Sequence, residues 1–219
     1  MLVAIDGPAG VGKSTIARRC AEHAGFLYIN SGSFYRAVTL AVLQRKVAPD
    51  DHEAVLGVAR SCRIELRDGE LFLDGRSVES LLHGDDVDSW VAAHSAIPAV
   101  RDIVNARLRE IAFRKDAVVE GRDIGTVVFP NAQLKIFLDA DITTRASRRH
   151  EQGVSGLSLE ETMAAIGARD TVDRSKPTGR LAAAPDAIQI DTSLLTMEQV
   201  CERVDKAILV SRNNPGDIR

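Results

Sequence analysis

The stretch LVAIDGPAGVGKST, residues 2–15, decides the fold of this chain. It opens with a short apolar run, as expected of a buried strand, and continues in the pattern G-x-x-x-x-G-K-[ST] of a phosphate-binding loop. Gly7, Gly10 and Gly12 allow backbone N–H groups to approach phosphate oxygens at the start of a helix. The stretch therefore predicts a strand, a loop and a helix that together hold a nucleoside triphosphate.

The side chains of this loop predict its chemistry. Lys13 supplies a mobile charge to the β- and γ-phosphates, and the hydroxyl of Ser14 is placed to face Mg²⁺. A glycine-rich turn with a chance lysine is the alternative, but a chance match in a chain of this length is rare. We expect the donor nucleotide to be bound by Gly7, Pro8, Ala9, Gly10, Val11, Gly12, Lys13, Ser14 and Thr15.

Four further apolar runs alternate with helical stretches along the chain. They cover residues 26–29, 117–120, 134–139 and 187–191, and Gly25 is expected to end the helix that follows the loop. This alternation is typical of a parallel sheet with helices on both faces. We therefore predict an α/β fold around a five-stranded parallel sheet.

Two stretches interrupt the alternation. Residues 62–78 carry two β-like runs around Asp68-Gly69, which predicts a hairpin inside an inserted domain that spans residues 45–97. After a flexible QGVSG (152–156), Ser158 and Glu161 form a capping box that opens a helix. Pro98, at the tolerated first turn, predicts a helix over residues 98–114, and Thr196 with Gln199 predicts the last helix before a frayed tail, 211–219.

The composition excludes several classes of protein. A net charge of −3 provides no overall basic field for nucleic acid, and no apolar run approaches the ~20 residues of a membrane helix. Cys20, Cys62 and Cys201 lack metal-ligand spacing and are interpreted as reduced thiols. We expect a cytoplasmic monomer without a signal peptide that binds neither nucleic acid nor membranes.

Arginines follow the ends of the predicted strands, where such sheets bind their ligands. If the phosphate acceptor is itself an anion, its transfer reaction needs several positive charges and no general base. Tyr35 and Arg36 follow the second strand, and Arg122 and Asp123 follow the third between Gly121 and Gly125. Later helices carry two more groups: Arg145, Arg148 and Arg149, and Arg169, Asp173 and Lys176, which share one helical face.

Most of these residues also have a structural interpretation. Arg145 and Arg149 would equally suit a solvated helix face, and Arg169 with Asp173 would suit a surface ion pair of little energy. Tyr35 could pack in the core. Arg122 is the hardest to explain structurally, because an arginine beside an aspartate in a glycine-flanked turn has little use in a core.

The blocks GPAGVGKST, SGSFYR, EGRDIGTVVFPNA, KIFLDA and RDTVDRSK occur in the order and spacing of bacterial cytidylate kinases. The chain resembles this family over nearly its whole length. The resemblance implies the nucleoside-monophosphate-kinase fold and the transfer of phosphate from ATP, with Mg²⁺, to CMP or dCMP. It implies a P-loop core (residues 1–44, 98–149 and 181–219), a monophosphate-binding insert (45–97) and a mobile helical lid (150–180).

The resemblance also implies residue roles. Arg36 and Arg122 would hold the acceptor phosphate, while Asp123 and Arg101 would read the cytosine edge. Arg145, Arg148 and Arg149 would bind ATP and neutralise the moving phosphoryl group. The implied catalytic residues are Lys13, Arg36, Arg122 and Arg169. The implied CMP-binding residues are Ser31, Tyr35, Arg36, Arg101, Gly121, Arg122, Asp123, Arg169, Asp173 and Lys176.

Three positions depart from the family pattern. Glu120 replaces the first aspartate of D-G-R-D, Lys176 stands where an arginine is usual, and Ala92 falls where a serine often faces the base. His94 or Ser95 could compensate for the missing hydroxyl. Two rival functions stay open: another small-molecule kinase on the same core, for UMP/AMP, thymidylate or shikimate, and a regulatory module that binds ATP without transferring phosphate.

Overall fold

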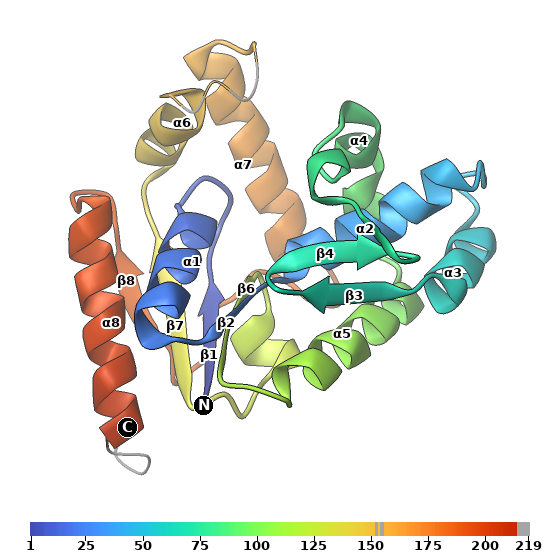
Figure 1. Cartoon of the computed structure of the whole chain (residues 1–219). Helices are drawn as coiled ribbons and strands as arrows, with labels where there is room; N and C mark the ends of the chain where they lie inside the picture. The colour runs from blue at the N-terminus through green and yellow to red at the C-terminus, as the bar shows by residue number, and fades with distance from the viewer. Residues whose placement is uncertain (152, 154–155, 214–219) are drawn as a thin grey trace. The chain divides into compact units, whose positions relative to one another are not determined.

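The computed structural model describes residues 1–151, 153 and 156–213 (Figure 1). The QGVSG stretch predicted to be flexible falls mostly outside these residues. Of the tail predicted to fray, residues 211–213 continue the last helix and the rest lies outside the described part. Contacts divide the chain into two compact units: Met1–Tyr28 with Lys115–Arg219, and Ile29–Arg114.

The larger unit is built on the predicted five-stranded sheet, in the order β2-β6-β1-β7-β8. β1 pairs in parallel with both β6 and β7, and β7 pairs in parallel with β8. The predicted strands are confirmed, with bounds that differ by at most one residue. They are β1 (Leu2–Asp6), β2 (Leu27–Asn30), β6 (Ala117–Gly121), β7 (Leu134–Asp139) and β8 (Ile188–Asp191).

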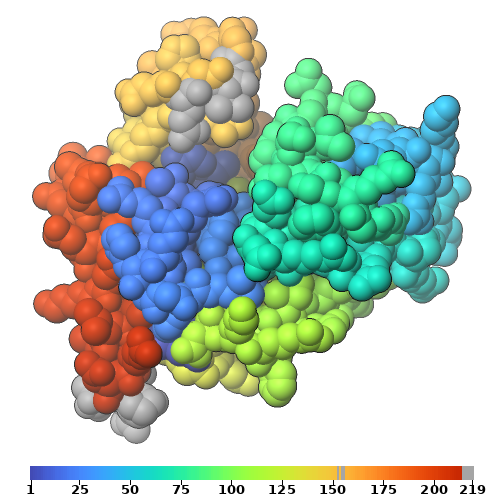
Figure 2. All heavy atoms as spheres, in the orientation of Figure 1, coloured from blue at the N-terminus to red at the C-terminus, as the bar shows by residue number. Residues whose placement is uncertain are grey.

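Helices α1 (Lys13–Ala24) and α8 (Met197–Asn213) pack side by side on this sheet (Figures 1 and 2). Apolar residues of β1 and β7 meet Ile16 and Cys20 of α1 and Val204 of α8 in one buried core. Gly25 ends α1 in the left-handed conformation, as predicted. The sheet thereby holds the strand ends, and the loops that follow them, in fixed positions.

Three further elements complete the larger unit: η2 (Ile124–Val128), a single turn of π-helix, α6 (Ile142–Glu151) and α7 (Leu159–Ser175). The predicted capping box is present, because Ser158 Oγ accepts the Glu161 N–H and Glu161 Oε2 accepts the Ser158 N–H. Thr196 and Gln199 cap α8 in the same reciprocal way. Among the residues described, no helix is long and apolar enough to cross a membrane.

The smaller unit combines helices with a three-stranded meander. Asp68 and Gly69 join β3 to β4 with φ of 50° and 84°, as a type I′ hairpin turn requires. Asp74 and Gly75 repeat this turn, so the predicted hairpin has a third strand that the sequence analysis missed. The elements are α2 (Ser31–Gln44), α3 (His52–Ser61), β3 (Ile64–Arg67), β4 (Glu70–Leu73), β5 (Arg76–Ser77), η1 (Glu79–Leu81), α4 (Asp85–His94) and α5 (Pro98–Ala112).

The boundaries of the two units come from contacts between residues, and they differ from the predicted boundaries of core, insert and lid. By contacts, α2 and α5 group with the meander, and residues 150–180 that the structure describes group with the sheet. The division into core, insert and lid therefore stays a prediction about how the chain moves and binds.

Candidate active site

The loop after β1 has the backbone of a phosphate cradle. Gly7, Gly10 and Gly12 all have positive φ, of 156°, 77° and 93°. A β-carbon on Gly7 would overlap the carbonyl oxygen of Leu138, and one on Gly10 would lie 3.0 Å from the carbonyl oxygen of Arg145. Glycine is therefore required for close packing at both positions, and not only for the turn.

Lys13 is the first residue of α1, and its ammonium group is buried beside the loop. Lys13 Nζ donates a hydrogen bond of 2.7 Å to the carbonyl oxygen of Pro8. Burial, followed by the positive charge of Arg122, lowers the pKa of Lys13 well below its usual range. An anion at this place would relieve both effects, which is what a phosphate group supplies. Ser14 and Thr15, one and two positions further on, are exposed.

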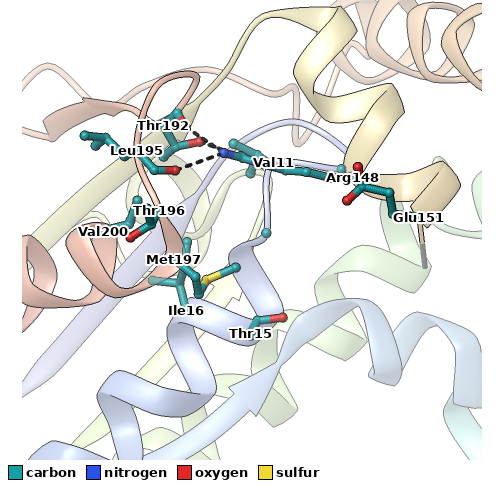
Figure 3. Close-up of a pocket in the computed structure, with 12 residues that line it drawn as sticks. Val11, Thr15, Ile16, Arg148, Glu151, Thr192, Leu195, Thr196, Met197 and Val200 are labelled. Carbon is teal, nitrogen blue, oxygen red and sulfur yellow. Dashed lines mark hydrogen bonds between the residues drawn. The ribbon is translucent and has the colours of Figure 1, made fainter.

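A pocket of about 400 Å³ adjoins the loop (Figure 3). Its volume suits a nucleoside, since ligand pockets span about 300–1,000 Å³. The sequence analysis named the loop residues and Arg148 but missed the opposite wall, which follows β8. Its lining residues are Gly10, Val11, Gly12, Thr15, Ile16, Arg148, Glu151, Thr192, Leu195, Thr196, Met197 and Val200.

The three arginines of α6 have different surroundings. Arg148 reaches across the pocket and donates to Thr192 Oγ1 and to the carbonyl oxygens of Thr192 and Leu195, at 2.7–3.4 Å (Figure 3). Arg145 is buried, so the interpretation of a solvated face is wrong for it. Arg149 is exposed.

Arg145 ties the loop to α7. Its guanidinium donates to the carbonyl oxygen of Ala9 at 3.1 Å and to that of Ala140 at 3.0 Å, and lies 2.6 Å from Asp170 Oδ2. Asp170 was not selected from the sequence. Its spacing of three residues from Asp173 could have suggested it, because residues three apart on a helix lie on the same face. Both carboxylates are indeed buried on α7.

A second cluster of charges surrounds Asp173 of α7. Its carboxylate accepts hydrogen bonds from Arg122 Nε at 3.0 Å and from Lys176 Nζ at 2.9 Å, while Arg169 Nε lies 4.0 Å away. Burial alone would raise the pKa of Asp173, but the charges of Arg122 and Lys176 hold it below its ordinary value. The predicted pairing of Arg169 with Asp173 is thus the weakest contact of this group.

Arg122 follows β6, and its loop is tied to the end of β1. Gly121 is the last residue of β6 and faces Asp6 in the sheet register. The buried carboxylate of Asp6 accepts the backbone N–H groups of Ile124 and Gly125. Burial raises the pKa of Asp6 to about 6 despite these bonds. The sequence analysis did not select Asp6.

Asp123, between Arg122 and η2, is buried in the larger unit, and the remaining predicted acceptor residues lie in the smaller unit. Arg36 of α2 contacts Asp88 Oδ1 at 2.6 Å and donates to the carbonyl oxygen of Leu82 at 2.9 Å. The Arg101 guanidinium lies over the Tyr35 ring, 5.4 Å from its centroid. Tyr35 also donates to Asn105 Oδ1 at 3.2 Å. Ser31, the first residue of α2, is buried.

Two of the three departures from the family pattern have visible consequences. The buried Glu120 accepts a 2.6 Å hydrogen bond from the Tyr28 hydroxyl, which anchors its longer side chain. His94 is buried, stacks on Trp90, and bonds through its two ring nitrogens to Thr39 Oγ1 and the Pro49 carbonyl oxygen. Both ring nitrogens of His94 therefore already have partners in this structure, and its compensation for Ala92 stays a prediction.

The residues at the loop fit a magnesium ion that travels with a nucleotide. Ser14 presents an exposed hydroxyl at the start of α1. The described residues contain no group of three or more histidine, cysteine, aspartate or glutamate side chains able to hold a metal. Mg²⁺ suits such a site, because it commonly takes one or two protein ligands and completes its shell with phosphate and water.

Comparisons with known proteins identify the family to which this chain belongs. A model of the cytidylate kinase family matches residues 3–209. A cytidylate kinase of Caldanaerobacter subterraneus subsp. tengcongensis is 43% identical over 219 residues, which cover 99% of this chain and 97% of the relative. One of Mycolicibacterium paratuberculosis is 44% identical over 212 residues, 93% of each chain.

Solved structures support the fold alone. A shikimate kinase of Bacteroides thetaiotaomicron aligns with a TM-score of 0.50 at 12% identity, covering 95% of this chain and 98% of that one. An uncharacterized protein of Eubacterium ventriosum aligns with a TM-score of 0.54 at 14% identity, covering 96% and 98%.

Proposed function

Because this chain belongs to the cytidylate kinase family, we propose that it transfers the terminal phosphoryl group of ATP to CMP and dCMP, forming CDP and dCDP. Besides the family, one observation supports this proposal: two cationic side chains, Lys13 and Arg122, interact electrostatically within the larger unit. Lys13 lies in the donor loop, and burial, followed by the positive charge of Arg122, lowers its pKa. A site with two anionic substrates needs this arrangement, whereas a protein that only binds ATP has no use for the second group.

The donor side is assigned from the pocket beside the loop. The backbone N–H groups of residues 7–15 and Lys13 bind the phosphates, and the pocket between the loop and the segment after β8 takes the nucleoside. Arg148 spans this pocket and is proposed to contact the bound nucleotide. Arg145, already held by Ala9 and Asp170, is proposed to stiffen the loop from behind, with Arg149 free to approach the phosphates from solvent.

The acceptor side is assigned from the remaining charges. Arg122, Arg169 and Lys176 are proposed to bind the acceptor phosphate, and the family resemblance implies the same role for Arg36. Asp123 and Arg101, with Ser31, Tyr35 and the backbone at Gly121, are proposed to bind the cytosine and its surroundings. Asp173 balances Arg122 and Lys176 until the acceptor arrives and is then proposed to reach the ribose.

The chemistry is a direct in-line displacement. An oxygen of the acceptor phosphate forms a bond to the γ-phosphorus, and the bond from that phosphorus to the β,γ-bridging oxygen breaks, so ADP leaves with the electron pair. Lys13, Arg36, Arg122 and Arg169 neutralise charge and align the reacting oxygens, and no side chain removes a proton. Ser14 would hold a Mg²⁺ ion that arrives with the nucleotide, and the ion would supply further neutralisation of phosphate charge.

The test is an ADP-release assay with MgATP and separate acceptors: CMP, dCMP, UMP, AMP, dTMP, shikimate and none. We expect strong turnover with CMP and dCMP only. Preference for another acceptor would replace the assignment by another kinase on the same core. ATP binding without turnover on any acceptor would indicate a regulatory module.

A pair of arginine variants tests the residue assignment. Arg122→Ala should abolish most CMP kinase activity, because it removes a charge proposed to hold the acceptor phosphate. Arg63→Ala is the matched control, since Arg63 immediately precedes β3, is exposed, and pairs through its side chain with Glu65 at the surface. Equal losses in the two variants would contradict the role of Arg122.

A further inference from the structure

We propose that Asp6 is a positioning residue for the acceptor side of the reaction, because its carboxylate holds the loop that carries Arg122 and Asp123. The inference rests on the proposed function, in which Arg122 binds the acceptor phosphate. Asp6 is the last residue of β1 and directly precedes Gly7 of the donor loop. Its position in the chain would suggest a donor role, whereas its contacts point to the acceptor side.

The geometry of Asp6 is that of a cap on a helical turn. Oδ1 accepts the Ile124 N–H at 2.8 Å and Oδ2 accepts the Gly125 N–H at 2.7 Å. These are the first two residues of η2, and only Arg122 and Asp123 separate them from β6. Because β1 and β6 are parallel neighbours with Asp6 opposite Gly121, the carboxylate reaches the next loop across the strand ends.

The turn needs such an acceptor at its start. The first N–H groups of any helical turn lack partners within it, and Ile124 and Gly125 are buried away from water. The Asp123 carbonyl oxygen accepts the N–H groups of Val127 and Val128, so Asp123 closes the turn through its backbone. Arg122 thus lies between a paired strand and a capped turn, and its backbone is held on both sides.

A carboxylate is the group that fits this task. Its two oxygens accept one N–H each, whereas an asparagine offers one oxygen and turns an NH₂ group toward the other donor. Burial raises the pKa of Asp6 to about 6, so keeping the ionised form here is costly. The space is also closed, because a β-carbon on Gly125 would lie 3.4 Å from Asp6 Oδ2 and 3.2 Å from Lys135 Cδ.

The experiment compares Asp6→Asn with the wild type by steady-state kinetics at pH 7.5. We expect the KM for CMP to rise about fivefold or more, while the KM for MgATP stays within about twofold. Asp51→Asn is the control, because Asp51 also accepts a backbone N–H at a helix start but is exposed in the smaller unit. An unchanged KM for CMP, or an equal rise in the KM for MgATP, overturns the proposal.

A double-mutant cycle with Arg122→Ala separates positioning from general stabilisation. If Asp6 acts through Arg122, Asp6→Asn adds less than about twofold to the KM for CMP once Arg122 is gone. Additive effects in the double variant would overturn the part of the proposal in which Asp6 acts through Arg122. If Asp6→Asn does not fold, Gly125→Ala takes its place, because its β-carbon would crowd Lys135 Cδ at 3.2 Å beside the turn that Asp6 caps and leave the carboxylate in place, and the same KM split is expected.

Failure of the proposed function and failure of the role of Asp6 would give different results. A wild-type protein that does not phosphorylate CMP removes the proposed function itself. A wild-type protein that phosphorylates CMP normally, with Asp6→Asn indistinguishable from it, removes only the role of Asp6.

Discussion

Alanine in place of Gly10 is expected to damage the donor site far more than alanine in place of Gly25. Both glycines are left-handed, with φ of 77° and 69°. A β-carbon in this conformation costs about 1–2 kcal/mol wherever it occurs. At Gly25 it would meet nothing within 4 Å, so this conformational cost is the whole expected effect.

Gly10 carries an additional cost that can be worked from its neighbours. Its β-carbon would lie 3.0 Å from the Arg145 carbonyl oxygen and 3.2 Å from Arg145 Cβ, which belong to α6 and cannot rotate away. Relief requires a backbone shift, and overpacking of this kind costs about 1–3 kcal/mol. We therefore expect Gly10→Ala to lose about 2–5 kcal/mol of unfolding free energy against about 1–2 kcal/mol for Gly25→Ala.

The functional consequence should fall on the donor. A shift of Arg145 moves the guanidinium that holds Ala9, and with it the phosphate cradle. We expect the KM for MgATP to rise about tenfold in Gly10→Ala, equivalent to about 1.4 kcal/mol, and to stay unchanged in Gly25→Ala. Urea unfolding followed by circular dichroism gives the stabilities, and ADP release gives both KM values.

Equal behaviour of the two variants would refute this reasoning. If both lose the same stability and keep the same KM for MgATP, the contact between Gly10 and α6 is not what excludes a side chain there. A larger rise in the KM for CMP than in that for MgATP would also contradict the assignment of this loop to the donor.

Three further outcomes are expected. Asp88→Asn should lower the KM for CMP about threefold without changing kcat, because Asp88 forms a half-exposed ion pair of about 0.7 kcal/mol with Arg36 and so competes with CMP for that side chain. An unchanged or higher KM for CMP would argue against this competition. Arg148→Ala should raise the KM for MgATP about tenfold and leave that for CMP unchanged, with the exposed Arg203→Ala as control; the opposite split would place Arg148 on the acceptor. Burial raises the pKa of the Asp6 carboxyl from its ordinary value of 3.8 to about 6, so the folded state binds a proton at Asp6 more tightly than the unfolded state does. Between pH 4 and 6 the wild type should therefore lose about 2 kcal/mol of stability relative to Asp6→Asn as the pH rises, and urea unfolding at several pH values should show this, whereas a constant difference would not fit.

The parts of the fold that were predicted correctly have local causes. Apolar runs marked the strands, the glycines marked the loop, and Gly25 and Ser158 marked helix ends, because each of these signals acts within a few residues. The third strand of the meander was missed although Asp74-Gly75 carries the same turn signal as Asp68-Gly69. Its strand has only two residues, too few to show a pattern.

The unpredicted parts of the candidate site depend on distant neighbours. Asp6 contacts residues 118 and 119 positions away, and only the sheet order brings β1 beside β6. Arg148 binds carbonyl oxygens of Thr192 and Leu195, and backbone acceptors leave no trace in side-chain chemistry. The arginines themselves, and Asp173, were selected because they follow strand ends where such sheets bind their ligands, whereas Asp6 and Asp170 needed the structure.

Trp90, which stacks on His94 in α4, gives the smaller unit a fluorescence signal of its own. Trp90 is the single tryptophan of the chain, so intrinsic fluorescence excited at its absorption edge originates in α4 alone. Far-ultraviolet ellipticity instead averages over all helices. Denaturation curves recorded with the two signals compare one unit with the whole molecule, and separate midpoints would mean that the chain melts in stages rather than in a single cooperative step.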